Sequence, residues 1–180
     1  MKRVFTKARY LLALVCMVLF GTNVVLAEET ITVKWFDSSS TTFSAVGKAS
    51  NPNVLTVSDA ANSSDITMES VKKYANVYWT QLKCATATDK NKISLKDYVT
   101  FKVTVNSGYK FTPTEASAYA IGEGTGNNAA KLYEGTTNSA VSAAATNSSS
   151  AENAVALTVT PTAKTYEEGE TFIVTLYVGA

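Results

Sequence analysis

The chain of 180 residues contains no histidine, and its arginines, Arg3 and Arg9, both lie within the first ten positions. It has only two cysteines, Cys16 and Cys84. Catalytic triads with a histidine base are therefore excluded, as are zinc sites built on histidine or on several cysteines. A catalytic thiolate needs a cationic or histidine partner that lowers its pKa, so we interpret Cys84 as a small apolar residue in or beside a strand.

The N-terminal segment has the three parts of a secretory signal. Four basic residues precede an apolar run at 11–20, and Ala27 ends a small-residue cleavage site. The sequence thus predicts a signal peptide over residues 1–27 and a domain over residues 28–180 that is secreted or displayed at the cell surface. A lipid anchor on Cys16 is the alternative, but this cysteine lies inside the apolar run after a valine, which favours ordinary cleavage.

Removal of the signal changes the charge balance, because four of the 16 basic residues lie in it and all 15 acidic residues follow it. The mature chain then carries a net charge of about −3, with lysines scattered along it. Nucleic-acid-binding proteins carry a basic stripe, so we expect no nucleic-acid partner. No second apolar run approaches the ~18–20 residues of a membrane span. We expect a monomer with one core and no disulfide within the chain.

Apolar and polar residues of the mature chain alternate with a period of two. The pattern is clearest at 98–105, 154–160 and 171–178, where one face carries valine, leucine and phenylalanine and the other threonine. Shorter segments with strand character are 31–36, 54–57, 77–82, 109–111, 117–121 and 131–134. Up to about nine short strands with one apolar face predict an all-β fold, namely a single antiparallel β-sandwich of jelly-roll-like type.

Helical and irregular segments are few. Only 65–76 has the features of a helical turn or two, with Asp65 as a cap and Met68, Val71 and Ala75 on one side. Residues 37–53 and 141–153 are interpreted as loops. The second could instead be an interdomain linker, but only two strands follow it, too few for a separate stable domain.

Two polar clusters are candidates for chemistry. The acidic run at 167–170 is interpreted as a solvated turn before the strand at 171, although a glycosidase that uses carboxylates alone remains an alternative. The glycine-rich run at 122–128 lacks the Lys-Ser/Thr ending of a phosphate-binding loop, so we interpret it as a connection between two strands. A structural calcium ion bound near Glu123 and Asn127 is the candidate metal site there. No other cofactor is expected.

Aromatic side chains are the candidate ligand-binding groups, because a flat aromatic face can pack against the apolar face of a sugar ring. The candidates are the aromatic residues Trp35, Trp79, Tyr98 and Tyr177 and the amide of Gln81 beside Trp79. Tyr78 and Leu82 share one face of the segment 77–82, which leaves Trp79 and Gln81 on the other. The alternation of apolar and polar residues places Tyr98 and Tyr177 on the solvent-facing sides of their strands. The alternatives are that the tryptophans are core residues and that the tyrosines only form cross-strand pairs.

Three segments carry a resemblance to a known family. YVTFKVTV at 98–105, GYKFTPT at 108–114 and GETFIVTLYV at 169–178 resemble the N-terminal all-β accessory module of secreted pectate lyases and related glycan-degrading proteins. The resemblance implies a jelly-roll-like sandwich without catalytic residues, with a carbohydrate-binding or spacer role beside a lyase or hydrolase. In that family another strand, and often a catalytic domain, follows the late strand, whereas this chain ends at Ala180.

The sequence therefore predicts a secreted, non-catalytic β-sandwich that binds polysaccharide through exposed aromatic and amide groups. The resemblance implies an accessory role in degradation of pectin-type polysaccharide. The alternative is a surface structural or adhesive subunit that self-associates or donates a strand to a neighbour. A carboxylate-only enzyme is the third hypothesis.

Overall fold

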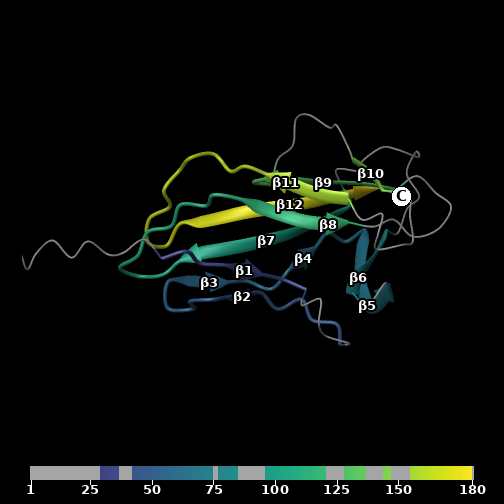
Figure 1. Ribbon diagram of the computed structural model, residues 1–180, viewed down its shortest axis with the longest axis horizontal. Helices are drawn as coiled ribbons and strands as arrows, with labels where there is room; N and C mark the ends of the chain where they lie inside the picture. The colour runs from purple at the N-terminus through teal and green to yellow at the C-terminus, as the bar shows by residue number, and fades with distance from the viewer. Residues whose placement is uncertain are drawn as a thin grey trace, which may run out of the picture. The chain divides into compact units, whose positions relative to one another are not determined.

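The computed structural model describes residues 29–36, 42–74, 77–84, 96–120, 128–136, 144–146 and 155–179. Within these ranges the chain forms strands and no helix (Figure 1). The strands are β1 (Val33–Lys34), β2 (Lys48–Ala49), β3 (Leu55–Val57), β4 (Ala61–Asn62), β5 (Ile66–Tyr74), β6 (Val77–Cys84), β7 (Tyr98–Val105), β8 (Ala116–Ala120), β9 (Asn128–Glu134), β10 (Ala144–Thr146), β11 (Val155–Val159) and β12 (Thr171–Gly179). Residues Ile31–Ala180 form one compact unit. In the described part, no helix is long and apolar enough to cross a membrane.

The largest sheet has six strands in the order β10-β9-β12-β7-β3, with β4 also paired to β7. Every pairing in it is antiparallel. Strands β7 and β12 form its centre, in a register that runs from Thr171 opposite Thr104 to Tyr177 opposite Tyr98. Their β-branched valines and threonines suit a pleated strand and disfavour a helix. The predicted all-β antiparallel fold is confirmed.

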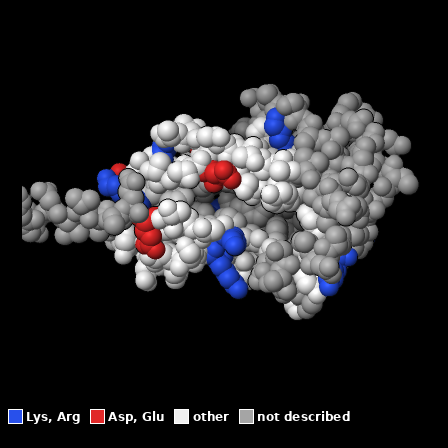
Figure 2. All heavy atoms as spheres, viewed as in Figure 1, with Lys and Arg blue, Asp and Glu red and all other residues white. Residues whose placement is uncertain are grey.

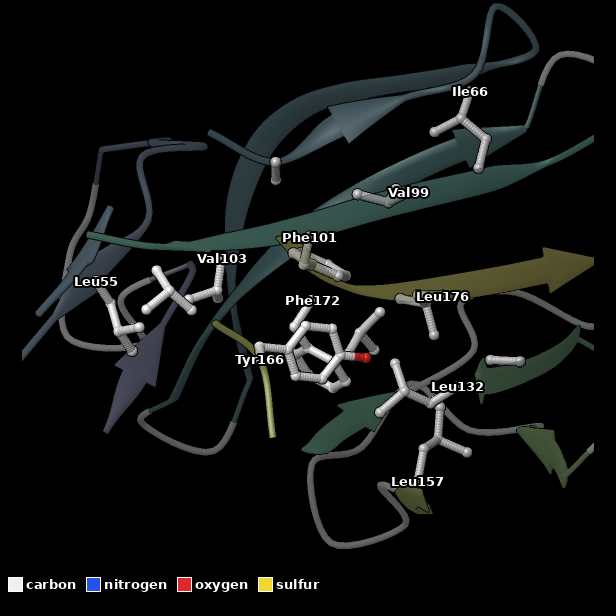
Figure 3. Packing of buried hydrophobic residues seen from close by; sticks show 14 of the residues in the cluster. Leu55, Ile66, Val99, Phe101, Val103, Leu132, Leu157, Tyr166, Phe172 and Leu176 are labelled. Atoms are coloured by element: carbon white, nitrogen blue, oxygen red, sulfur yellow. The ribbon is translucent and has the colours of Figure 1, made fainter. Parts of the chain in front are cut away.

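Two-stranded sheets cover the apolar face of this large sheet. They pair β1 with β2, β8 with β11 and β5 with β6. Buried side chains of β7, β9 and β12 form one cluster with Leu157 of β11 and Ile66 of β5 (Figure 3). The partly buried alanines of β8 and Val33 of β1 pack against the same cluster. The covering layer is therefore assembled from separate hairpins and strand pairs, an arrangement consistent with a β-sandwich.

The helical turn expected within 65–76 is wrong, because this segment forms β5. The reason is a β-bulge between Met68 and Val71. These two residues are three apart in sequence, yet they lie opposite Leu82 and Thr80, which are two apart. One extra residue in a strand thus produces the spacing of three that is typical of a helix face.

The remaining differences concern short strands. The loop expected at 37–53 contains β2, and the loop expected at 141–153 contains β10. The strand expected at 109–111 is reduced to a single bridge between Phe111 and Tyr166. Strands of two or three residues carry at most one alternation of faces, so a period of two cannot identify them.

Candidate functional site

Tyr98 and Tyr177, both predicted ligand-binding residues, lie side by side on β7 and β12. Tyr133 of β9 completes a cluster in which the Tyr177 ring centre is 5.8 Å from that of Tyr98 and 5.7 Å from that of Tyr133. The Tyr177 hydroxyl donates a hydrogen bond of 2.7 Å to the carbonyl oxygen of Thr136. Tyr177 lies on the predicted face of its strand, but its side chain is only 3% exposed, so the predicted exposure to solvent is wrong.

Trp35 lies in a different place, beside the core. Its ring centre is 5.1 Å from that of Phe101, and its Nε1 donates a hydrogen bond of 2.8 Å to the carbonyl oxygen of Ser58. The side chain is partly buried against the main apolar cluster. The structure therefore does not bring Trp35 together with Tyr98 and Tyr177.

Replacing Gly47 with alanine is expected to lower the free energy of unfolding by about 1–3 kcal/mol, because overpacking forces neighbours to move. A Cβ at position 47 would overlap Val57 Cγ1 and Trp35 Nε1, and would lie 2.9 Å from the carbonyl oxygen of Ser58. Urea unfolding measures the effect. Val46→Ala is the control, because Val46 is 49% exposed, and a shift of the midpoint no larger than in this control would contradict the proposed packing.

Trp79 and Gln81 lie on β6, in the sheet that β6 forms with β5. Leu82 packs against the core, so alternation along the strand places Trp79 and Gln81 on the opposite face, as the sequence indicated. Both side chains are partly buried. The Nε1 atom of Trp79 is buried and has no hydrogen-bond partner among the described residues. These two candidates form a pair of their own, in a different sheet from the tyrosine cluster.

Among the described residues, Tyr119 is the most exposed aromatic side chain, at 71%, and it was not one of the candidates. It lies on β8, directly opposite Ala156 of β11, and the next pair on the same face is Ser117 opposite Thr158. All four side chains are exposed. We call this surface the Tyr119 face. The signal was present in the sequence Ala-Ser-Ala-Tyr-Ala at 116–120, whose alanines pack toward the core and therefore direct Ser117 and Tyr119 outward.

The Tyr119 face leaves the tyrosine ring open. Directly opposed residues in an antiparallel pair have Cβ atoms about 4.5–5.5 Å apart, so a large side chain at position 156 would cover the ring. Ala156 has only a methyl group and cannot do so. The ring, with the hydroxyl groups of Ser117 and Thr158 beside it, can pack on an apolar surface and exchange hydrogen bonds with a polar ligand.

The acidic cluster at 167–170 connects the turn before β12 to the turn that contains Gly108 through hydrogen bonds. Glu168 accepts a hydrogen bond of 2.9 Å from the backbone N–H of Gly108. Glu170 accepts one of 2.8 Å from the backbone N–H of Glu167 and one of 2.9 Å from Lys164. These backbone hydrogen bonds are the largest cause of the lowered pKa of Glu168 and of Glu170, and the hydrogen bond from Lys164 adds to the effect at Glu170. As the sequence indicated, the cluster forms an exposed turn before β12.

Stability is expected to fall in acid because of these carboxylates. A group whose pKa in the folded state lies below its ordinary value of 4.5 contributes stability above that value, and the contribution is lost as pH falls through the folded pKa. The urea midpoint should therefore decrease as pH drops from about 5 to about 3. In a Glu168→Gln, Glu170→Gln double variant the decrease should be smaller, and an identical pH profile would contradict these roles.

The candidate calcium ligands, Glu123 and Asn127, lie outside the described residues, as does the predicted signal peptide. In the ranges that the structure does describe, no group of three or more histidine, cysteine, aspartate or glutamate side chains could hold a metal ion. Cys84 is the last residue of β6.

The described aromatic side chains thus include the tyrosine cluster, Trp35 beside the core, Trp79 on β6 and the exposed Tyr109 and Tyr119. The ring of Tyr177 is enclosed and Trp79 is partly buried, whereas Tyr119 has an open ring on a paired strand. When the chain was compared with protein-family models, curated proteins and solved structures, no significant match was found in any of the three.

Proposed function

We propose that the chain is a secreted, non-catalytic carbohydrate-binding module that acts beside a polysaccharide-degrading enzyme, with the Tyr119 face as its binding surface. The observation that carries the proposal is the 71% exposure of Tyr119 on a strand whose opposing residue is Ala156. A large aromatic ring left in water loses the free energy that its burial would give, at about 25 cal/mol per Å² of apolar surface. A sugar ring stacked on Tyr119 would recover part of it.

The position of Tyr119 on a paired strand favours binding. Its strand is held by β11 over five paired positions, from Ala116 opposite Val159 to Ala120 opposite Val155. The side chains of Ala116 and Ala118 are anchored against the core. A side chain with two rotatable bonds on an ordered strand loses little conformational entropy when a ligand immobilises it.

Other aromatic residues are less suited to a ligand, because their rings already contact the protein. Tyr177 packs between Tyr98 and Tyr133, and Trp35 packs on Phe101. Access to either ring would require these packed neighbours to separate. Trp79 is only partly exposed, and its ring would present less surface than that of Tyr119.

Further support for a non-catalytic role comes from composition and from the acidic turn. Histidine is missing from the whole chain. Glu168 and Glu170 are engaged in hydrogen bonds with backbone N–H groups, which hold them in the carboxylate form. Together with the resemblance to accessory modules of pectate lyases, these features favour a partner enzyme that supplies the catalytic groups.

Affinity electrophoresis of the chain lacking residues 1–27 tests the proposal. The protein runs through native gels that contain pectin, xylan or mucin, with serum albumin as the non-binding reference. Retardation by at least one polymer is expected, relative to a gel without polysaccharide. Unchanged mobility in every gel would refute carbohydrate binding, and a ladder of self-associated species without retardation would favour the structural subunit instead.

A further inference from the structure

We infer that the Tyr119 face takes an uncharged polysaccharide chain rather than a polyuronate. The inference rests on the proposed function and specifies its ligand class. Pectin-type polyuronates carry carboxylate groups along the chain, so a surface that binds them must supply cations or strong hydrogen-bond donors. The chemistry of the Tyr119 face is different.

The outward positions of the face carry no charge. Among the described side chains of β8 and β11, those that point away from the core are Ser117, Tyr119, Ala156 and Thr158. The residue that precedes β8 is Glu115, whose side chain is exposed. At physiological salt the Debye length is about 8 Å, so a carboxylate within one or two residues of the face repels a polyanion. A neutral chain meets no such penalty.

Hydroxyl groups make the face suitable for a neutral sugar. Ser117 and Thr158 are directly opposite each other, two paired positions along the strands from Tyr119 and Ala156 and on the same surface. Each hydroxyl can donate one hydrogen bond and accept two, which matches the hydroxyls of an uncharged sugar. Residues two apart on a strand are about 6.6–6.8 Å apart, so hydroxyls and ring lie within reach of one saccharide chain.

Charged side chains elsewhere on the described surface do not form a basic track. In the view of Figure 2, lysine side chains occur as small separate groups, with neutral residues over most of the described surface between them. Two of the exposed lysines are already paired with carboxylates, Lys110 with Glu167 and Lys164 with Glu170, each at 2.9 Å.

The test compares polymers of known charge by affinity electrophoresis at two salt concentrations. Xylan, galactan and hydroxyethylcellulose are the neutral probes, and polygalacturonate is the anionic one, each at about 20 mM and about 500 mM sodium chloride. We expect retardation by at least one neutral polymer, with a dissociation constant that changes less than about twofold with salt. Retardation by polygalacturonate alone, lost at high salt, would overturn the inference and leave carbohydrate binding intact. Mobility that no polymer changes would refute the proposed function itself.

A charge-adding variant provides the second arm. Thr158→Lys places a cation on the Tyr119 face at an exposed strand position, and Thr158→Gln is the uncharged control of similar length. Retardation by polygalacturonate at low salt should appear in the lysine variant and be absent from the glutamine variant. Equal binding of polygalacturonate by wild type and both variants would contradict the inference.

Discussion

Replacing Tyr119 with alanine is expected to weaken retention by the bound polysaccharide at least about tenfold, which corresponds to ~1.4 kcal/mol or more. A single exposed aromatic anchor supplies most of the apolar contact on this face, and such anchors dominate the free energy of binding. Affinity electrophoresis over a series of polymer concentrations gives the dissociation constants. The substitution removes a side chain that is 71% exposed, so the free energy of unfolding should change by no more than about 0.5 kcal/mol.

Tyr109→Ala is the matched control for this loss. Tyr109 is also an exposed tyrosine, at 39%, but it lies in the turn that follows β7 rather than on β8. Its replacement should leave retention within about twofold of wild type. An equal loss of affinity in both variants would contradict a binding surface on β8 and β11. Unchanged affinity in Tyr119→Ala would contradict it as well.

Replacing Phe172 with alanine is expected to destabilise the fold by about 3–5 kcal/mol. Phe172 is 6% exposed and lies on β12 opposite Val103. Its ring centre is 5.5 Å from that of Tyr166 and 6.2 Å from that of Phe111, so the substitution leaves a cavity where the isolated bridge joins the core (Figure 3). Urea unfolding should show a lower midpoint with an unchanged slope.

Thr171→Ala is the control for the neighbouring position, since Thr171 is exposed and its hydroxyl shares a hydrogen bond of 2.9 Å with that of Thr104. This substitution should lower the free energy of unfolding by about 1 kcal/mol, the typical contribution of one hydrogen bond. Should Phe172→Ala not fold, Phe172→Leu keeps most of the buried volume and allows the measurement. If Phe172→Leu lowered the free energy of unfolding by less than Thr171→Ala does, this result would contradict the packing described for Phe172.

Alternation along a strand predicted the faces of the long strands well. In β7 and β12 the apolar residues at every second position are buried, as expected from the sequence, except Val178, which is partly buried. On the opposite face, however, Thr100 and Thr175 are also buried, where the alternation predicted exposure to solvent. The burial of Tyr177 could not be predicted in the same way, because it depends on β9 being the neighbour of β12 and on the carbonyl oxygen of Thr136 reaching its hydroxyl. Strand order is set by contacts between distant segments, which no local pattern contains.

The outward position of Tyr119, in contrast, could be predicted from the local alternation of residues along β8. The alanines at 116, 118 and 120 are weakly hydrophobic, so the alternation in β8 is less obvious than in β7, although it has the same physical basis. The bulge in β5 shows a further limit. A strand with one inserted residue loses its period of two, and the spacing from Met68 to Val71 then favours the wrong element.

The most direct test is a nuclear magnetic resonance titration of the chain lacking residues 1–27 with two neutral probes, xylohexaose and cellohexaose. Binding at the Tyr119 face predicts that at least one probe shifts the backbone amide signals of Ser117, Tyr119, Ala156 and Thr158 in a saturable manner. The amides of Tyr98, Tyr133 and Trp79 should move little. Shifts confined to those three residues, or no shift with either probe, would contradict binding of an uncharged sugar chain at this face.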